Sequence, residues 1–302
     1  MSVTRREFLT STACALTLDP LRGFAQAPAP PPVPRFLDVR GNVGIFTAQG
    51  GTIGYLINDA GVLAVDSQYA HTITLFQAGL RERSPRPVEL LVNTHHHADH
   101  TGGNQALRST TKRIVAHENC LASHRKAAAE QKTEGQQSFA DTTFTDQWRT
   151  DFGGEGVQAR YYGAGHTGGD AVVHFQKANV VHMGDLLFNR AHPNIDRPAG
   201  AVIATWITVL EKVSKAHGAD TVFIAGHGKD NAVQCGRADL LHFRDYLTAC
   251  LDTARKAVAA GQPREALAAQ TELKGFEDTA ALNQRLTLGF VLGTCYDELA
   301  KK

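Results

Sequence analysis

A dense group of metal-binding side chains stands in one short stretch of this chain. Residues 95–100 hold four histidines and one aspartate. Successive side chains of an extended segment point to opposite faces, so His95 and His97 can bind one cation from the same side. Asp99 and His100 follow where the chain turns, and they can face a second cation close by. Imidazole and carboxylate groups suit zinc and iron, so this stretch predicts a metal site.

Three more motifs supply the further ligands that such a site needs. A zinc site requires three or four ligands, and the stretch at 95–100 is incomplete by itself. His166 lies in a glycine-rich turn, Asp185 follows an apolar run, and His227 lies between two glycines. Glycine allows close approach of the backbone, and a carboxylate can bridge two cations through its two oxygens. Each motif follows a predicted strand, so together they predict one shared centre.

Strand-like and helix-like patterns alternate along the chain and place these motifs at strand ends. Residues 36–66 contain four short β-rich runs separated by Gly, Asn and Asp, which predict an antiparallel meander. The apolar run at 88–92 is typical of a strand buried on both faces, so residues 95–100 follow a central strand. Further strands are predicted over residues 113–116, 157–162, 171–175, 180–183 and 221–225. Helices are predicted over 70–83, from 104, and over 118–130, 203–217, 236–260, 264–271 and 279–299, while 131–148 gives no assignable pattern.

Two β-rich halves, each followed by helices, predict the fold class. The chain has 302 residues, of which 42% are hydrophobic, and this is enough to bury one large core. The alternation favours one α/β (α+β) unit with two sheets packed face to face and helices outside.

Composition narrows the function classes. A formal net charge of +1 gives no broad basic field, which argues against a nucleic-acid partner. After the N-terminus no run is long and apolar enough to cross a bilayer, so we expect no stable membrane anchor. A small-molecule substrate fits this balance, and the oligomeric state does not follow from the sequence.

The N-terminus resembles an export signal. The stretch Thr4-Arg5-Arg6-Glu7-Phe8-Leu9 is similar to a twin-arginine motif, and small and apolar residues follow it. Ala25-Gln26-Ala27 is a candidate cleavage site, so residues 1–27 are the predicted signal peptide. Residues 28–35 are rich in proline and predict an extended spacer. We therefore expect a periplasmic or secreted protein, and the alternative is an unstructured basic N-terminus.

The cysteines say less about the structure than the metal-binding motifs do. Four of them follow the predicted signal peptide, and they are Cys120, Cys235, Cys250 and Cys295. An even number permits disulfides in an oxidising compartment, but a chain of this length does not need them. Buried, small, hydrophobic side chains are the favoured interpretation.

The order of the metal-binding motifs resembles that of the metallo-β-lactamase-fold hydrolase superfamily, from about residue 43 to about residue 229. The family's motifs match seven residues here: His95, His97, Asp99, His100, His166, Asp185 and His227. The resemblance implies a four-layer αββα sandwich over residues 36–235, with residues 236–302 as a helical extension packed on it. It implies that one metal is held by His95, His97 and His166, and the other by Asp99, His100 and His227, with Asp185 bridging.

Asp185 bears on the substrate class that the resemblance implies. One large class of true β-lactamases has cysteine at this position and another has serine, whereas glyoxalase II, lactonases and other ester or thioester hydrolases have aspartate. The chain is therefore more similar to the bridging-aspartate members, some of which cleave lactams as a side activity. The implied activity is that of an exported dinuclear zinc hydrolase acting on an ester, thioester, lactone or lactam.

The expected mechanism rests on the charges of the two cations. Sharing one water lowers the pKa of that water from near 16 towards about 7, which yields a hydroxide at neutral pH. We expect this metal-bridging hydroxide to attack an acyl carbon, with Asp99 as a catalytic group that holds it in line. Asp66 resembles the family's aspartate that orients a ligand histidine, and a turn cap is the alternative. No substrate-binding residue follows from the sequence.

Three other interpretations stay open. Persulfide dioxygenases of the same fold use one iron held by two histidines and an aspartate, and these ligand types suit iron as well as zinc. The others are a metallo-β-lactamase acting on antibiotics and a metal-carrying binding module. Retention of the complete ligand set favours the hydrolase. Weaker candidates for contact with metal or substrate are His96, His174, His182, His192, Lys229, Trp148 and Phe188.

Overall fold

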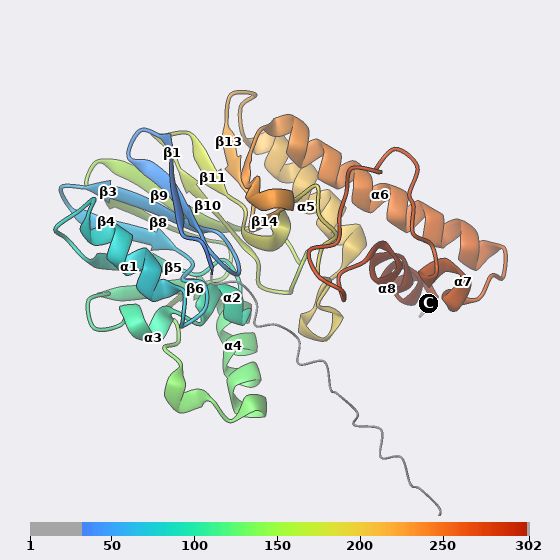
Figure 1. Ribbon diagram of the computed structural model, residues 1–302, viewed down its shortest axis with the longest axis horizontal. Coiled ribbons are helices and arrows are strands. Elements are labelled where there is room, and N and C mark those ends of the chain that lie inside the picture. Colours follow the sequence, from blue (N-terminus) through green and yellow to red (C-terminus); the bar gives the residue numbers. More distant parts are fainter. Residues whose placement is uncertain (1–31, 301–302) are drawn as a thin grey trace, which may run out of the picture. The chain divides into compact units, whose positions relative to one another are not determined.

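Two β-sheets pack face to face in residues 32–300, the part of the chain that the computed structural model describes (Figure 1). The predicted signal peptide and residues 28–31 of the predicted spacer lie outside the described residues. The first sheet has seven strands in the order β1-β2-β3-β4-β5-β6-β7, and the second has six in the order β15-β13-β11-β10-β9-β8.

The first sheet joins an antiparallel half to a parallel half. Its strands are β1 (Arg35–Arg40), β2 (Val43–Thr47), β3 (Ile53–Asn58), β4 (Gly61–Val65), β5 (Val88–Val92), β6 (Arg113–His117) and β7 (Thr142–Phe144). β1 to β4 form the predicted antiparallel meander, and β5 lies parallel to both β4 and β6. Every residue of β4 is buried, because a helix covers one face and the second sheet covers the other.

The second sheet contains strands that the sequence pattern did not fully assign. Its strands are β8 (Gln147–Phe152), β9 (Glu155–Tyr161), β10 (Ala171–Phe175), β11 (Val180–His182), β13 (Val222–Ile224) and β15 (Gln234–Cys235). β7 and the start of β8 fall in the unassigned stretch 131–148. β8 is an edge strand with alternating exposed and half-buried residues, so it lacks a continuous apolar run. A third, two-stranded sheet pairs β12 (Phe188–Asn189) with β14 (His227–Gly228).

Helices form the two outer layers (Figure 1). Those on the side of the first sheet are α1 (Ile73–Arg81), α2 (Ala98–Thr101), α3 (Asn104–Leu107) and α4 (Glu118–Gln131). Those on the side of the second sheet are α5 (Ile203–Ala216), α6 (Arg237–Ala259), α7 (Arg264–Ala268) and α8 (Leu288–Ala300). The arrangement is a four-layer αββα sandwich, which confirms the predicted fold class. No helix within residues 32–300 combines the length and apolar character needed to cross a bilayer.

The predicted start of the last helix is wrong. α8 begins at Leu288 instead of residue 279, and α7 ends at Ala268 instead of residue 271. Ala280 pairs through its backbone with a neighbouring loop, and the side chain of Asn283 accepts hydrogen bonds from two backbone N–H groups in a turn. These contacts compete with helical hydrogen bonding and leave residues 279–287 irregular.

Aromatic packing joins the outer helices to the second sheet. Trp206 of α5 is fully buried and meets the ring of Phe243 of α6 at 5.7 Å between centroids. Its indole N–H donates to the carbonyl of Leu186 at 3.0 Å, which satisfies the buried donor. The four cysteines within the described residues are buried and unpaired, as the favoured interpretation expected.

One carboxylate ties α8 to the start of α5. Oε1 of Glu298 accepts a hydrogen bond from the backbone N–H of Ala204 at 3.0 Å, and Oε2 accepts from that of Ile203 at 2.9 Å. The same Oε2 pairs with Nη1 of Arg197 at 2.6 Å. The first N–H groups of a helix lack partners within the helix, so this carboxylate satisfies them and complements the helix dipole.

Glu298→Ala should therefore lower the free energy of unfolding by about 2 kcal/mol, because two helix N–H groups and one guanidinium lose their acceptor. Urea denaturation of both proteins measures the difference. Glu130→Ala is the matched control, since among the described residues the Glu130 carboxylate makes only an exposed ion pair with Lys126, and its loss should cost less than about 0.5 kcal/mol. Equal effects of the two substitutions would contradict the role given to Glu298.

Candidate metal centre

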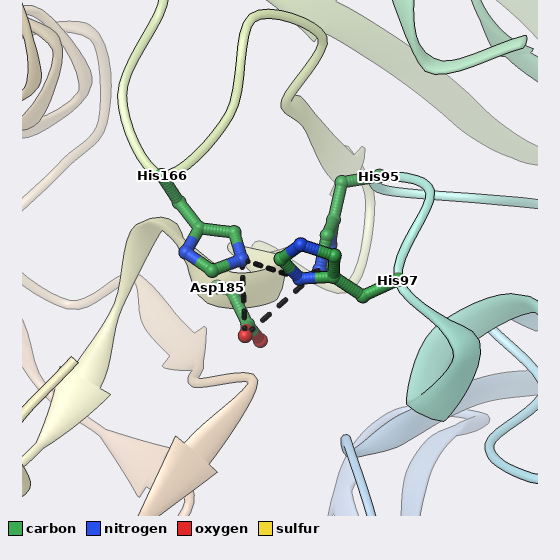
Figure 2. A group of neighbouring side chains, drawn as sticks. All are labelled: His95, His97, His166 and Asp185. Atoms are coloured by element: carbon green, nitrogen blue, oxygen red, sulfur yellow. Dashed lines mark hydrogen bonds and ion pairs between the residues drawn. The ribbon is translucent and has the colours of Figure 1, made fainter. Parts of the chain in front are cut away.

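The predicted ligands meet at one end of the sheets (Figure 2). β5 ends at Val92, and His97, the residue before α2, still has an extended backbone. His166 comes from the loop between β9 and β10, and Asp185 from the turn after β11. Figure 2 shows these side chains pointing toward one another although they belong to separate segments.

Three histidines and one aspartate form the first group. Nδ1 of His97 lies 3.1 Å from Nε2 of His95 and 2.9 Å from Nε2 of His166. Oδ2 of Asp185 lies 3.4 Å from Nε2 of His166 and 3.9 Å from Nε2 of His95. His97 is half-buried and the other three are buried. Their donor atoms surround one common point.

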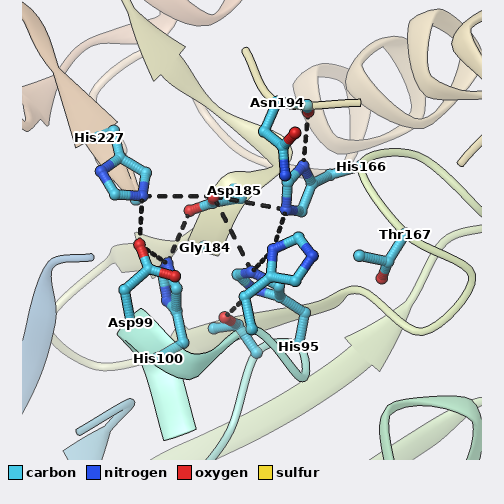
Figure 3. Close-up of polar contacts among 12 residues, drawn as sticks. His95, Asp99, His100, His166, Thr167, Gly184, Asp185, Asn194 and His227 are labelled. Carbon is cyan, nitrogen blue, oxygen red and sulfur yellow. Dashed lines mark hydrogen bonds and ion pairs between the residues drawn. The ribbon is translucent and has the colours of Figure 1, made fainter. Parts of the chain in front are cut away.

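Asp99, His100 and His227 form a second group beside the first (Figure 3). Nε2 of His227 lies 3.2 Å from Oδ2 of Asp99 and 3.3 Å from Oδ2 of Asp185. Nε2 of His100 lies 3.0 Å from Oδ1 of Asp185. Asp185 therefore contacts both groups, and all seven residues predicted as ligands come together.

Oxygen acceptors hold the outer ring nitrogens of four histidines. The pairs are His95 Nδ1 with Thr94 Oγ1 (3.1 Å), His97 Nε2 with Asp196 Oδ2 (2.9 Å), His100 Nδ1 with Asp66 Oδ2 (2.8 Å) and His166 Nδ1 with the Asn194 carbonyl (2.8 Å). Carbonyl and carboxylate oxygens only accept, so the ring nitrogen must donate. Thr94 donates its hydroxyl to Asp66 at 2.7 Å and is left to accept from His95. With the outer nitrogen protonated, the inner nitrogen of a neutral ring carries a lone pair, which is the form that binds a metal.

A cation fits both groups, because ring lone pairs face one another in the first and the carboxylates of Asp99 and Asp185 lie against the histidines of the second. Donor atoms repel one another when no proton lies between them, whereas a tetrahedral zinc with bonds of about 2.0 Å holds its nitrogens about 3.3 Å apart. Nε2 of His100 and Oδ1 of Asp185 are buried and lie 3.0 Å apart without hydrogen-bond geometry, and neither has another hydrogen-bond partner among the described residues. Donor type, spacing and these two unpaired atoms all fit bound divalent cations.

The chain also matches a known family along most of its length. The sequence model described as the metallo-beta-lactamase superfamily matches residues 39–258, which include every residue of both groups. The chain belongs to the metallo-β-lactamase superfamily. It is accordingly a metal-dependent hydrolase.

Relatives of this superfamily member are about a quarter identical to it over the aligned residues. The metallo-beta-lactamase type 2 of Bacillus cereus is 27% identical over 197 residues, 64% of this chain and 72% of the relative. The 2,4-dinitroanisole O-demethylase subunit alpha of Nocardioides sp. (strain JS1661) is 26% identical over 159 residues, 52% of this chain and 47% of the relative.

Solved structures support the fold. A metallo-beta-lactamase from Pontibacter korlensis superposes with a TM-score of 0.61 at 20% identity, over 72% of this chain and 99% of that one. The sec-alkyl sulfatase PisA1, as a double mutant, gives a TM-score of 0.64 at 16% identity, over 87% of this chain and 50% of that one. At these identities the likeness concerns the fold alone.

Burial and carboxylates shift pKa values in opposite directions within the centre of this superfamily member. Burial lowers the pKa of His166 to about 4. Burial would also lower the pKa of His227, but the carboxylates of Asp185 and Asp99 outweigh it and raise the pKa to about 9. Burial opposes ionisation of Asp99, but His100 and His227 hold its pKa at about 2. Without a cation, His227 therefore carries a proton near neutral pH, and a binding metal must displace it.

Two glycines bring the backbone against the ligands. A Cβ atom at Gly51 would lie 2.1 Å from the ring of His100, and one at Gly226 would lie 2.0 Å from Oδ1 of Asp185. Only glycine fits at such distances. Thr52 N, next to Gly51, donates to the carbonyl of Gly226 at 2.9 Å, so one hydrogen bond fixes both contacts.

Asp66 contacts the ligand histidine that the resemblance implied. Its Oδ2 accepts from Nδ1 of His100, and its Oδ1 accepts from the backbone N–H of Thr94 at 2.7 Å. One carboxylate thus positions a ligand of the second group and the segment that leads to the first. The turn-cap alternative describes part of the same role, because Asp66 caps the backbone at Thr94.

Several positioning contacts were missed by the sequence reasoning. Asp196 and Asn194 hold His97 and His166, and both lie in the loop that precedes α5. Asp170 accepts from the backbone N–H groups of Gly165 and Thr167 on either side of His166, and burial raises its pKa to about 7. The only available signal was an acidic residue in a turn, which is also what an ordinary cap contains.

The weaker candidates mostly lie elsewhere. His182, His174 and His192 contact the Thr52 carbonyl, the ring of His217 and the hydroxyl of Tyr246, respectively. His96 lies 3.8 Å from Asp196, in a third possible group with His97. Lys229 donates to the carbonyl of Asp278, and Trp148 packs against the core. Phe188 stacks on His227 at 5.3 Å and lines the cavity at the centre.

Asp66→Ala should weaken metal binding by about tenfold to a hundredfold, because His100 loses the acceptor that fixes its tautomer and orientation. Competition with a chromogenic chelator measures the affinity. Asp66→Asn keeps one acceptor oxygen and should fall between the wild type and Asp66→Ala. Unchanged affinity in Asp66→Ala would show that His100 does not depend on this contact.

Proposed function

We propose that the protein is an exported dinuclear zinc hydrolase that cleaves an ester, thioester, lactone or lactam. The observation that supports it best is the meeting of two complete donor groups around Asp185. His95, His97 and His166 would hold one ion, Asp99, His100 and His227 the other, and Asp185 would bridge them. An iron oxygenase of the kind considered above needs only one group, so the complete second group favours hydrolysis.

The chain's own residues suit an acyl-transfer site. Bound divalent cations would lower the pKa of a water and polarise an acyl oxygen. Asp99 lines a cavity of about 460 Å³ and keeps a low pKa, so its ionised carboxylate can accept a hydrogen bond from an attacking water and orient it. Tyr69 and Phe188 line the same cavity, and their aromatic rings would exclude water from part of it.

Asp185 supports the substrate class. A carboxylate here is the feature shared with glyoxalase II and lactonases, whereas the Bacillus relative is a metallo-beta-lactamase by name. We propose ester, thioester or lactone cleavage as the main activity and lactam cleavage as a secondary one.

Metal content together with a substrate panel tests the proposal. Elemental analysis of the purified protein should find about two zinc ions per chain. The panel contains a chromogenic cephalosporin, an aryl ester, a lactone and a glutathione thioester, of which at least one should be turned over. A chelator should abolish this turnover and added zinc should restore it. One iron per chain, oxygen consumption and no hydrolysis would instead establish the oxygenase.

Asp99→Ala separates catalysis from metal retention. We expect at least one metal to stay bound, because the first group is intact, and kcat to fall by about a hundredfold or more. Asp146→Ala is the control, since Asp146 is exposed and remote from the seven ligands in the sequence. Turnover by Asp99→Ala at the wild-type rate would refute the role of Asp99.

The proposed export signal requires the paired arginines Arg5 and Arg6. Replacing both, Arg5→Lys with Arg6→Lys, should leave the unprocessed protein in the cytoplasm. Cell fractionation and the intact mass measure this, and the exported wild type should lack residues 1–27. Arg35→Lys, beyond the predicted cleavage site, should be exported normally. Export of the double variant at the wild-type level would contradict a twin-arginine signal.

A further inference from the structure

A segment near the C-terminus forms one wall of the cavity at the metal centre. Leu282, Asn283, Arg285 and Leu286 line this cavity together with residues of both metal groups. The segment 279–287 lies beyond residue 258, where the match to the superfamily's sequence model ends. It therefore adds chemistry to the cavity that the superfamily motifs do not supply.

Backbone contacts hold this segment in place. Ala280 donates its N–H to the carbonyl of Arg190 and accepts from the N–H of His192, both at 3.0 Å. The side chain of Asn283 accepts from the backbone N–H of Arg285 at 2.9 Å and so shapes the turn that carries this arginine. Figure 1 shows the chain leaving α7, passing towards β14 and returning to α8.

Arg285 has no carboxylate partner among the described residues. Its guanidinium donates to the side-chain oxygen of Asn194 at 3.3 Å, whose backbone carbonyl holds the ligand His166. Other arginines nearby in the sequence or fold are paired, namely Arg190 with Asp278, Arg197 with Glu298, Arg244 with Asp245 and Arg264 with Asp297. Among the described residues that line the cavity, Arg285 is the one arginine or lysine.

We propose that Arg285 binds a carboxylate of the substrate, so that the enzyme prefers acyl substrates that carry an acid. This rests on the proposed hydrolase function. The guanidinium presents parallel N–H donors that match a planar carboxylate. Leu282 and Leu286 contact the apolar part between that carboxylate and the bond that is broken. Lys229, two residues after His227 in the sequence, does not line the cavity.

The side chain of Arg285 is exposed to solvent. This exposure determines how strongly the enzyme should prefer acidic substrates and how that preference should depend on salt. A charge-assisted hydrogen bond to a solvent-accessible guanidinium should give about a tenfold preference for the acidic substrate. Because salt screens exposed charges, this preference should fall as ionic strength rises.

Matched esters test the proposal. The neutral substrate is para-nitrophenyl hexanoate. One acidic substrate is the mono-para-nitrophenyl ester of adipic acid, which has a carboxylate in place of the terminal methyl group, and the other carries a carboxylate on the nitrophenyl ring. Values of kcat/KM are measured for the metal-loaded wild type, Arg285→Ala, Arg285→Lys and the control Arg237→Ala, with spontaneous hydrolysis subtracted. Within residues 32–300, Arg237 also lacks a carboxylate partner; it donates to the His217 carbonyl and does not line the cavity.

Arg285→Ala should lower kcat/KM for at least one acidic ester by about tenfold and leave the neutral ester within about twofold. Arg285→Lys should retain part of the preference, and Arg237→Ala all of it. An equal loss on neutral and acidic esters, or no loss on either acidic ester, would overturn the proposal.

A binding measurement tests the carboxylate site at Arg285 independently of the hydrolase function. If the wild type cleaves none of the esters, titration calorimetry with adipate and hexanoate still tests the carboxylate site. Adipate should bind the wild type about tenfold more tightly than hexanoate, and Arg285→Ala should remove the difference. Binding of adipate by Arg285→Ala as tightly as by the wild type would overturn the carboxylate site whatever the reaction.

Discussion

Donor atoms with lone pairs converge at one end of the sandwich, and the rest of the structure depends on this constraint. The inner nitrogens of His95, His97 and His166 face one another at about the spacing of ligands around a common cation. Leaving a buried polar atom without a partner costs about 1–3 kcal/mol, so the metal-free arrangement works against folding. The fold resists relaxation by holding each outer nitrogen with an oxygen. A cation that bound only the folded chain would offset this cost.

The strand directions explain why so many ligands reach one place. β4 and β5 run parallel in the first sheet, and β11 and β13 run parallel in the second. Asp66 follows β4, His95 follows β5, Asp185 follows β11 and His227 follows β13, so all four lie beyond carboxyl ends of strands. Each residue needs only the short turn after its strand to reach the centre. The buried strands thus act as the rigid frame, and the turns carry the chemistry.

The sequence predicted these ligands because each is encoded locally, as a chemical group directly after an apolar run. Contacts between separate segments have no such local signature. In the sequence, Gly51 is an ordinary loop glycine and Asp196 an ordinary turn residue. Only the folded structure shows that His100 packs on Gly51 and that Asp196 contacts His97. The start of the last helix was predicted wrongly for the same reason. Residues 279–287 have a helical pattern, but pairing of Ala280 with a distant loop overrides it.

Packing of the C-terminal helices is connected to the geometry of the ligands. Glu298 of α8 holds Arg197, and Arg197 lies in the loop that also contains Asn194 and Asp196. Those two residues position His166 and His97. A chain of contacts therefore runs from the last helix to the first metal group. Residues after 258 lie outside the superfamily match, yet they brace the loop that sets the ligands and line the cavity above them. The residues after 258 therefore support the geometry of the candidate metal centre, because Glu298 holds the loop whose Asn194 and Asp196 contact two of the predicted ligands.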